Sequence, residues 1–178
     1  RGGGKRGGRP WPESVDLAGC YAGRIRFTLR DAWEVAGRTF PEGALLAIDA
    51  AAFRESGELP SIETVYTPDD RTSIEGVTVS RSGLYVSLLQ NVKGSILRFG
   101  VEAKSGEWRA EPLPLPPSGT VSLSAANPHS GTVFVNYEDH ITPDRLSEYD
   151  AGANALTRLK ARLLHTSDGA DELTRVPL

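Results

Sequence analysis

The sequence predicts an all-β fold, about three blades of four-stranded antiparallel sheet from a β-propeller. Three observations support this prediction. Apolar residues alternate with polar ones through most of the chain after Gly23, and Gly, Pro, Ser and Asp separate the alternating runs. The whole pattern also recurs about every 50 residues, which is typical of a propeller blade. A chance repeat within a β-sandwich is the alternative.

Each expected strand is a short run with period-2 alternation or continuous apolar character. In RIRFTL, Arg24 to Leu29, the residues Ile25, Phe27 and Leu29 share one face. A short helix is expected over Ala51–Ser56, AAFRES, and the absence of further helical periodicity excludes an alternating βαβ fold. The remaining expected strands are, in chain order, ALLAID, SIETVYT, GVTVS, GLYVSLL, SILRF, EWRAEPL, TVSLSA, TVFVNY, RLSEYD and ALTRLKA.

The repeat is marked by a small residue followed by glycine before one strong strand of each unit. These pairs are Ala22-Gly23, Ser82-Gly83 and Ser130-Gly131. The first unit carries extra residues in one place, DAWEVAGRTFPEG, as expected for an insertion in a loop between strands. The expected organisation is a basic arm at 1–9, blades at 10–60, 61–115 and 116–165, and a tail or the start of a crossing segment at 166–178.

The stretch GTVFVNYEDHITPDRLSEYD, residues 131–150, is predicted to hold the two middle strands of the third blade. Asp150 ends one of these strands, as Asp49 ends the corresponding strand of the first unit. Pro143 has no N–H group for a β-ladder, so we expect it in the connection between the two strands.

Composition restricts the class of protein further. The 178 residues carry a net charge of −3 and contain no apolar run long enough for a transmembrane helix. Cys20 is the only cysteine, which predicts a reducing, cytoplasmic location and a small buried hydrophobic side chain. The chain has no methionine and starts at Arg1, so we expect a fragment. The arm RGGGKRGGR has no aromatic residue and precedes an acidic body, so we expect a linker there and no nucleic-acid binding.

Three segments resemble the propeller domain of the prolyl oligopeptidase family of serine peptidases. They are the aromatic-containing run from Trp33 to Asp49, the LLQNVKGSILRF hairpin at 88–99 and the ITPDRLSEYD element at 141–150. The resemblance covers residues 10–162 in order along the chain. It implies part of a seven-bladed propeller that lies over an α/β-hydrolase domain and admits short peptides for cleavage after proline. The family's crossing segment has only a faint counterpart in LLHTSDGADELTRVPL, which lacks its lysine.

The catalytic chemistry of such a peptidase is missing from this sequence. No serine has glycine at both the −2 and +2 positions, so the G-x-S-x-G elbow is absent. We expect His129 and His140 in exposed loops, where Glu138 and Asp139 are the carboxylates that can raise the pKa of His140. Asp69-Asp70 is interpreted as turn chemistry because it lacks calcium-loop spacing. The sequence therefore predicts no catalytic, cofactor-binding or metal-ligating residue.

Partners are expected because three blades cannot close a ring and open sheet edges invite pairing. The predicted partners are the α/β-hydrolase domain of the same parent protein, with a peptide substrate, or a second copy paired through open blade edges. Trp33, Arg38, Asp139 and His140 are guesses at exposed partner contacts. The alternative function is a stand-alone propeller-like binding module without catalysis, and a degenerate gene remnant is a third reading.

Overall fold

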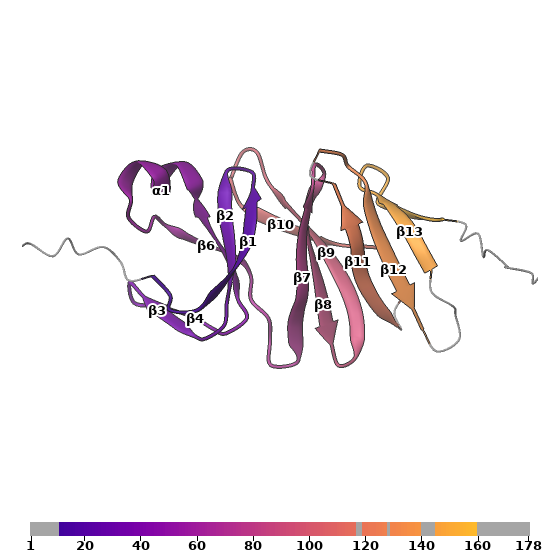
Figure 1. The fold of residues 1–178 in the computed structure, drawn as a ribbon, viewed down its shortest axis with the longest axis horizontal. Helices are drawn as coiled ribbons and strands as arrows, with labels where there is room; N and C mark the ends of the chain where they lie inside the picture. The colour runs from indigo at the N-terminus through magenta and orange to yellow at the C-terminus, as the bar shows by residue number, and fades with distance from the viewer. Residues whose placement is uncertain (1–10, 117–118, 128, 140–144, 160–178) are drawn as a thin grey trace, which may run out of the picture.

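The computed structural model describes residues 11–116, 119–127, 129–139 and 145–159. These residues form three four-stranded antiparallel sheets and one two-stranded hairpin. The sheets stand side by side in chain order from one end of the molecule to the other (Figure 1). In every sheet the strands lie in chain order, with the hairpin inserted between the second and third strands of sheet 1. This is the meander of a propeller blade and confirms the predicted fold class.

Sheet 1 contains a strand that the sequence analysis did not identify. This strand, β1, precedes the expected Arg24–Leu29 strand, and the hairpin β3–β4 lies inside the predicted insertion. Sheet 1 also extends beyond residue 60, the end of the first expected blade, because β6 pairs with β5. The elements of sheet 1 and its insertion are β1 (Val15–Tyr21), β2 (Arg24–Leu29), β3 (Trp33–Val35), β4 (Arg38–Phe40), β5 (Leu45–Asp49), α1 (Ala50–Ser56) and β6 (Ile62–Tyr66).

Sheets 2 and 3 follow the same plan without an insertion. Sheet 2 consists of β7 (Thr72–Ser80), β8 (Gly83–Gln90), β9 (Lys93–Val101) and β10 (Trp108–Pro112), and sheet 3 of β11 (Thr120–Ala126), β12 (Val133–Glu138), β13 (Arg145–Asp150) and β14 (Ala155–Arg158). The two strands predicted in residues 131–150 are β12 and β13, the central pair of sheet 3. Thr142, Pro143 and the expected segments at 1–9 and 166–178 lie outside the described residues.

The first strand of each sheet carries a β-bulge. The register shifts between Leu17 and Gly19 in β1, between Ile74 and Gly76 in β7, and between Leu123 and Ala125 in β11. A bulge bends and twists an edge strand, which discourages pairing with a foreign strand. These first strands also contact each other in sequence, β1 with β7 and β7 with β11. They therefore form the common inner side of the three sheets.

Asp49 and Asp150 occupy equivalent places, as the repeat predicted. The Asp49 side chain caps α1 by accepting a hydrogen bond from the Ala52 N–H at 2.7 Å. The Asp150 side chain accepts one from the Gly152 N–H, also at 2.7 Å, in the turn after β13. The helix expected over Ala51–Ser56 is thus present as α1, and it starts directly after this capping residue.

Three apolar clusters hold the sheets together. One fills the space between sheets 1 and 2, here called seam 1–2, and includes Leu45, Leu84 and Phe99. A second fills seam 2–3 and includes Ile96 and Val135. The third covers the face of sheet 1 that looks away from sheet 2, where β3–β4 and α1 supply Trp33, Val35, Phe40 and Phe53. The insertion therefore packs onto a sheet face that would otherwise be open.

Two expectations about individual side chains are wrong. Trp33, a suggested exposed partner contact, is buried in the third cluster at 7% exposure because β3 packs on sheet 1. Cys20, expected inside, is exposed. Its strand, β1, is the edge of sheet 1 and has only β2 beside it, so its side chains are covered less than those of a central strand.

Candidate functional site

The two ends of the sheets differ in what they carry. At one end, here called the turn end, lie the β1–β2, β7–β8 and β11–β12 turns. At the other, the connection end, the chain passes from one sheet to the next through residues 67–71 and 113–119. Among the described residues, a cleft lies at the connection end, and polar contacts between sheets 1 and 2 lie at the turn end.

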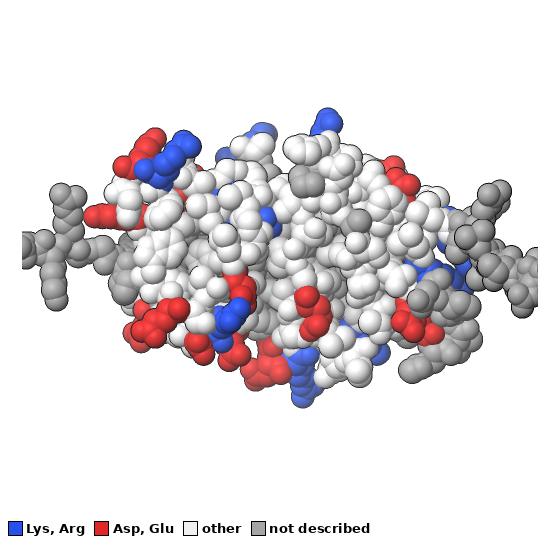
Figure 2. Space-filling view, viewed as in Figure 1, with Lys and Arg blue, Asp and Glu red and all other residues white. Residues whose placement is uncertain are grey.

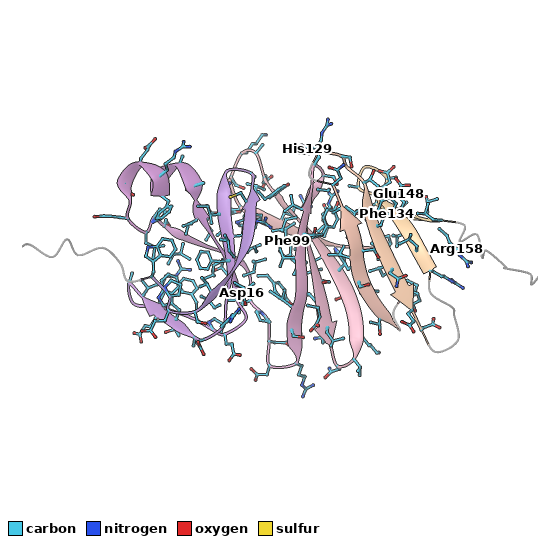
Figure 3. All side chains as sticks on the ribbon, viewed as in Figure 1. Asp16, Phe99, His129, Phe134, Glu148 and Arg158 are labelled. Atoms are coloured by element: carbon cyan, nitrogen blue, oxygen red, sulfur yellow. The ribbon has the colours of Figure 1, made fainter. Side chains whose placement is uncertain are left out.

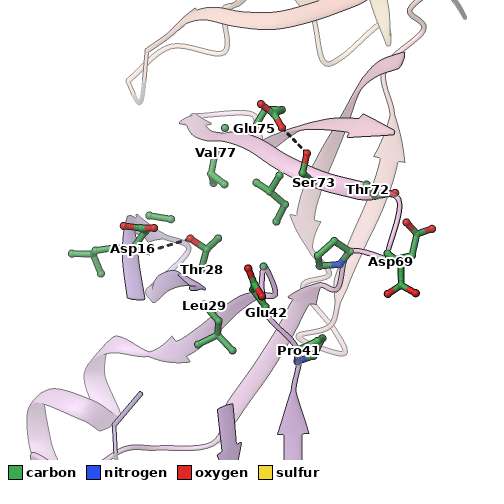
Figure 4. Close-up of a pocket in the computed structure, with 17 residues that line it drawn as sticks. Asp16, Thr28, Leu29, Pro41, Glu42, Asp69, Thr72, Ser73, Glu75 and Val77 are labelled. Atoms are coloured by element: carbon green, nitrogen blue, oxygen red, sulfur yellow. Dashed lines mark hydrogen bonds between the residues drawn. The ribbon is translucent and has the colours of Figure 1, made fainter. Parts of the chain in front are cut away.

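A cleft of about 750 Å³ opens at the connection end, between sheet 1 and sheet 2 (Figure 4). One wall comes from β1, β2 and the residues before β5, and the other from β7 and the connection that leads into it. Five carboxylates line the cleft, and Figure 2 shows Asp and Glu side chains along this lower edge of the molecule. They are Asp16, Glu42, Asp69, Asp70 and Glu75.

Two of these carboxylates have a lowered pKa. The Asp16 carboxylate accepts hydrogen bonds from the Arg30 guanidinium, one of them at 2.8 Å, and this contact lowers its pKa. The pKa of Asp69 is lowered by hydrogen bonds from the Thr72 side chain and from the Arg71 N–H, the latter at 3.0 Å. The Asp69 contact is the turn chemistry that the sequence predicted. Both groups are thus held as anions, and the cleft favours cationic or hydrogen-bond-donating groups.

The cleft cannot perform nucleophilic catalysis with the residues described. Its hydroxyl groups belong to Thr28, Thr72 and Ser73, and Ser73 donates to Glu75 at 2.5 Å. No histidine lines it, and His129 lies exposed at the turn end of sheet 3, far from Asp16 (Figure 3). Within the part of the chain that the structure describes, no cluster of side chains suited to a metal ion occurs and no helix is long and apolar enough to cross a membrane.

The other suggested contact residues are held locally. Arg38 is exposed on β4, where its guanidinium lies 4.7 Å from the Phe40 ring centroid and donates to the Ile62 carbonyl at 3.3 Å. Asp139 accepts a hydrogen bond from the Tyr137 hydroxyl at 3.1 Å. His140 lies outside the described residues. The structure does not bring Arg38 and Asp139 together. Arg38 lies on the hairpin that packs on sheet 1, and Asp139 follows β12 of sheet 3, at the opposite end of the row.

Seam 1–2 is fastened at the turn end by a polar contact that sequence reasoning missed. Glu63 on β6 accepts hydrogen bonds from Arg24 Nε at 2.6 Å and from Trp108 Nε1 at 2.8 Å, and Trp108 belongs to sheet 2. Arg24 also donates to the Gly106 carbonyl of sheet 2 at 3.2 Å. We call this set of residues the clasp. Arg24 was the one signal of this contact in the sequence, since a charged residue in a strand needs a partner if its face of the sheet is covered.

Seam 2–3 is fastened at both ends. At the turn end, the Arg81 N–H donates to the Ser130 carbonyl at 2.9 Å, and Arg98 donates to the Ala151 carbonyl at 3.0 Å. At the connection end, the Gly94 N–H donates to the Gly119 carbonyl at 3.0 Å. The two seams therefore differ in construction, because seam 1–2 has a cleft where seam 2–3 has a backbone hydrogen bond.

These features define a class of protein, a run of propeller blades with inner strands in contact and without a catalytic triad in the described residues. The chain belongs to the family described as prolyl oligopeptidase, N-terminal beta-propeller domain, which it matches over residues 30–162. It is 28% identical over 152 residues to an uncharacterized peptidase of Sinorhizobium fredii, a match that covers 84% of this chain and 20% of that protein.

Solved structures agree on the fold. A post-proline cleaving enzyme from Rickettsia typhi matches with a TM-score of 0.75 at 16% identity, over 86% of this chain and 22% of that one. Oligopeptidase B from Leishmania major matches with a TM-score of 0.59 at 13% identity, over 83% of this chain and 20% of that one. The chain thus spans about a fifth of the length of the relatives that it matches.

Proposed function

We propose that this chain is the substrate-gating propeller portion of a prolyl-oligopeptidase-like serine endopeptidase that acts on short peptides. The observation that carries the proposal is the family match over residues 30–162 on three consecutive four-stranded sheets. An α/β-hydrolase domain of the same parent protein is the proposed partner and supplies the Ser-His-Asp triad for acyl transfer. The proposed location is the cytoplasm.

The blades contribute exclusion by size. In this proposal the inner strands β1, β7 and β11, which contact each other in chain order, line the path of the peptide. The apolar clusters that fill the seams beside them support the exclusion of a folded protein. Exclusion protects other proteins from hydrolysis without requiring any reactive group on the blades. This division of labour is consistent with the lack of a nucleophile and base in the cleft.

An antibody raised against this chain tests the proposal in extracts of the source cells. The expected result is a band several times heavier than 19.1 kDa that reacts with a fluorophosphonate probe. The immunoprecipitate should cleave a short peptide after proline and leave a folded protein with the same sequence in a surface loop intact. The recombinant 178-residue chain, which should not react with the probe, is the control.

A band at 19.1 kDa without probe labelling would contradict the proposal and support the stand-alone binding module. Self-association through open sheet edges is the proposed state of the chain in that case. Light scattering of the purified chain distinguishes a self-associated form from a monomer, because self-association gives a multiple of the 19.1 kDa mass.

A further inference from the structure

We infer that seam 1–2 is a built-in hinge, at which sheet 1 swings away from sheet 2 about the clasp and widens the cleft. The inference concerns the described residues of this chain alone and does not depend on the proposed peptidase. Three properties distinguish this seam from seam 2–3: where it is fastened, what its interior contains, and what its open end carries.

At its connection end, seam 1–2 is joined by the chain segment 67–71, without a hydrogen bond between the two sheets among the described residues. The clasp residues Arg24, Glu63, Gly106 and Trp108 all lie at the turn end. Among the described residues, the hydrogen bonds between sheets 1 and 2 are these side-chain contacts, whereas backbone hydrogen bonds join sheets 2 and 3 at both ends. Seam 2–3 also packs more tightly, because a Cβ on Gly94 would lie 2.6 Å from the backbone nitrogen of Val121.

The interior of seam 1–2 contains a charge with unpaired donors. Arg26 is 1% exposed, and its Nε and Nη1 atoms have no hydrogen-bond partner in the described structure. Its strand position pairs with Ala47, which packs in the seam 1–2 cluster, so the Arg26 side chain faces sheet 2. A buried guanidinium with unpaired donors is costly, and opening the seam lets water reach it. The buried Arg26 therefore makes the free energy of closing seam 1–2 less favourable than apolar packing alone would make it.

The open end of the seam carries like charges on its two walls. Glu42 stands on the sheet 1 side, and Asp69, Asp70 and Glu75 stand on the sheet 2 side. All four side chains are exposed, so water and salt screen the repulsion between the walls and it is weak. The buried guanidinium therefore supplies the main force for opening, whereas the clasp and the apolar cluster favour closure.

Distances between spin labels test the hinge directly. In a Cys20→Ser background, Leu17→Cys with Val92→Cys measures seam 1–2, and Val92→Cys with Leu146→Cys measures seam 2–3. These three side chains are 73%, 85% and 40% exposed, so labels should not disturb packing. We expect a broad or two-component distance distribution across seam 1–2 and a single narrow one across seam 2–3. Equally narrow distributions would overturn the inference.

Two substitutions should move the seam 1–2 distribution in opposite directions. Glu63→Gln weakens the clasp and should shift the distribution toward longer distances, while Arg26→Leu removes the buried charge and should narrow it toward the closed distance. Glu111→Gln is the matched control, because Glu111 pairs at 2.7 Å with Arg98, the residue that bonds to sheet 3. The same response to Glu63→Gln and Glu111→Gln across seam 1–2, or no response to Arg26→Leu, would contradict the mechanism.

Hydrogen exchange on the unaltered chain provides a second test if a labelled variant fails to fold. Amides at the start of β7 beside the cleft, residues 72–76, should exchange faster than those at the start of β11 beside sheet 2, residues 120–124. Both segments lie in a bulged first strand that pairs with one neighbour in its own sheet, so they differ mainly in the seam that they face. Equal protection of the two segments would also overturn the inference.

Discussion

Substitution of Gly94 by alanine should destabilise the protein through seam 2–3. An ideal Cβ at this position lies 2.6 Å from both the Cγ2 and the backbone nitrogen of Val121, so the backbone of β11 must shift. Overpacking of this kind costs about 1–3 kcal/mol, and a weakened hydrogen bond from Gly94 to Gly119 costs about 1 kcal/mol more. Alanine regains about 0.5–1 kcal/mol of the entropy that glycine loses in a strand. The expected net loss is about 1–3.5 kcal/mol.

Gly100→Ala is the matched control for this prediction. Gly100 lies on the same strand, β9, and beyond its chain neighbours no atom comes within 4 Å of the place where an alanine Cβ would lie. We therefore expect a gain of about 0.5–1 kcal/mol from the change to alanine. Urea unfolding of the two variants and the parent gives the free energies of unfolding. If Gly94→Ala and Gly100→Ala agree within about 0.5 kcal/mol, the proposed close packing of sheets 2 and 3 is refuted.

Three further predictions follow from individual side chains. Trp33→Ala should cost about 3–5 kcal/mol in urea unfolding because Trp33 is buried under the insertion, and Trp11→Ala should cost less because Trp11 is 44% exposed. Asp16 has a lowered pKa when folded, so it stabilises the protein above its unfolded pKa of about 3.9 and loses this effect as the pH falls through its folded pKa. Asp16→Asn should therefore flatten the decline in stability below about pH 4, and an unchanged decline would contradict the Arg30 contact. Cys20 should react fully with a thiol reagent in the native protein, and protection until denaturant is added would contradict its exposure.

The predictable part of the fold is the part with regular alternation. RIRFTL alternates without interruption, and its apolar residues Phe27 and Leu29 are buried as expected. β1 was missed because the bulge at Gly19 shifts its register, so VDLAGCY does not show a continuous period of two. The hairpin β3–β4 was missed as well, because its turn residues Ala36 and Gly37 both adopt positive φ in a turn that Asn-Gly or Asp-Gly ordinarily signals.

The candidate site was less predictable because its contacts join distant residues. Glu63 and Trp108 belong to different sheets, and no local pattern indicates that a glutamate of one will accept a hydrogen bond from an indole of the other. The burial of Arg26 was not predictable either, because a charged residue in an alternating strand is typical of a solvent-facing position. Its face is covered by sheet 2, and only the arrangement of the sheets determines this.

The insertion in sheet 1 makes the two ends of the row chemically unlike. β3–β4 and α1 seal the outer face of sheet 1, whereas the outer face of sheet 3 presents Leu146 at 40% exposure beside the half-buried Phe134. The row of sheets therefore has a direction. Among the described residues, the apolar face that a further sheet can cover lies on sheet 3, and the corresponding face of sheet 1 is already covered by its own insertion.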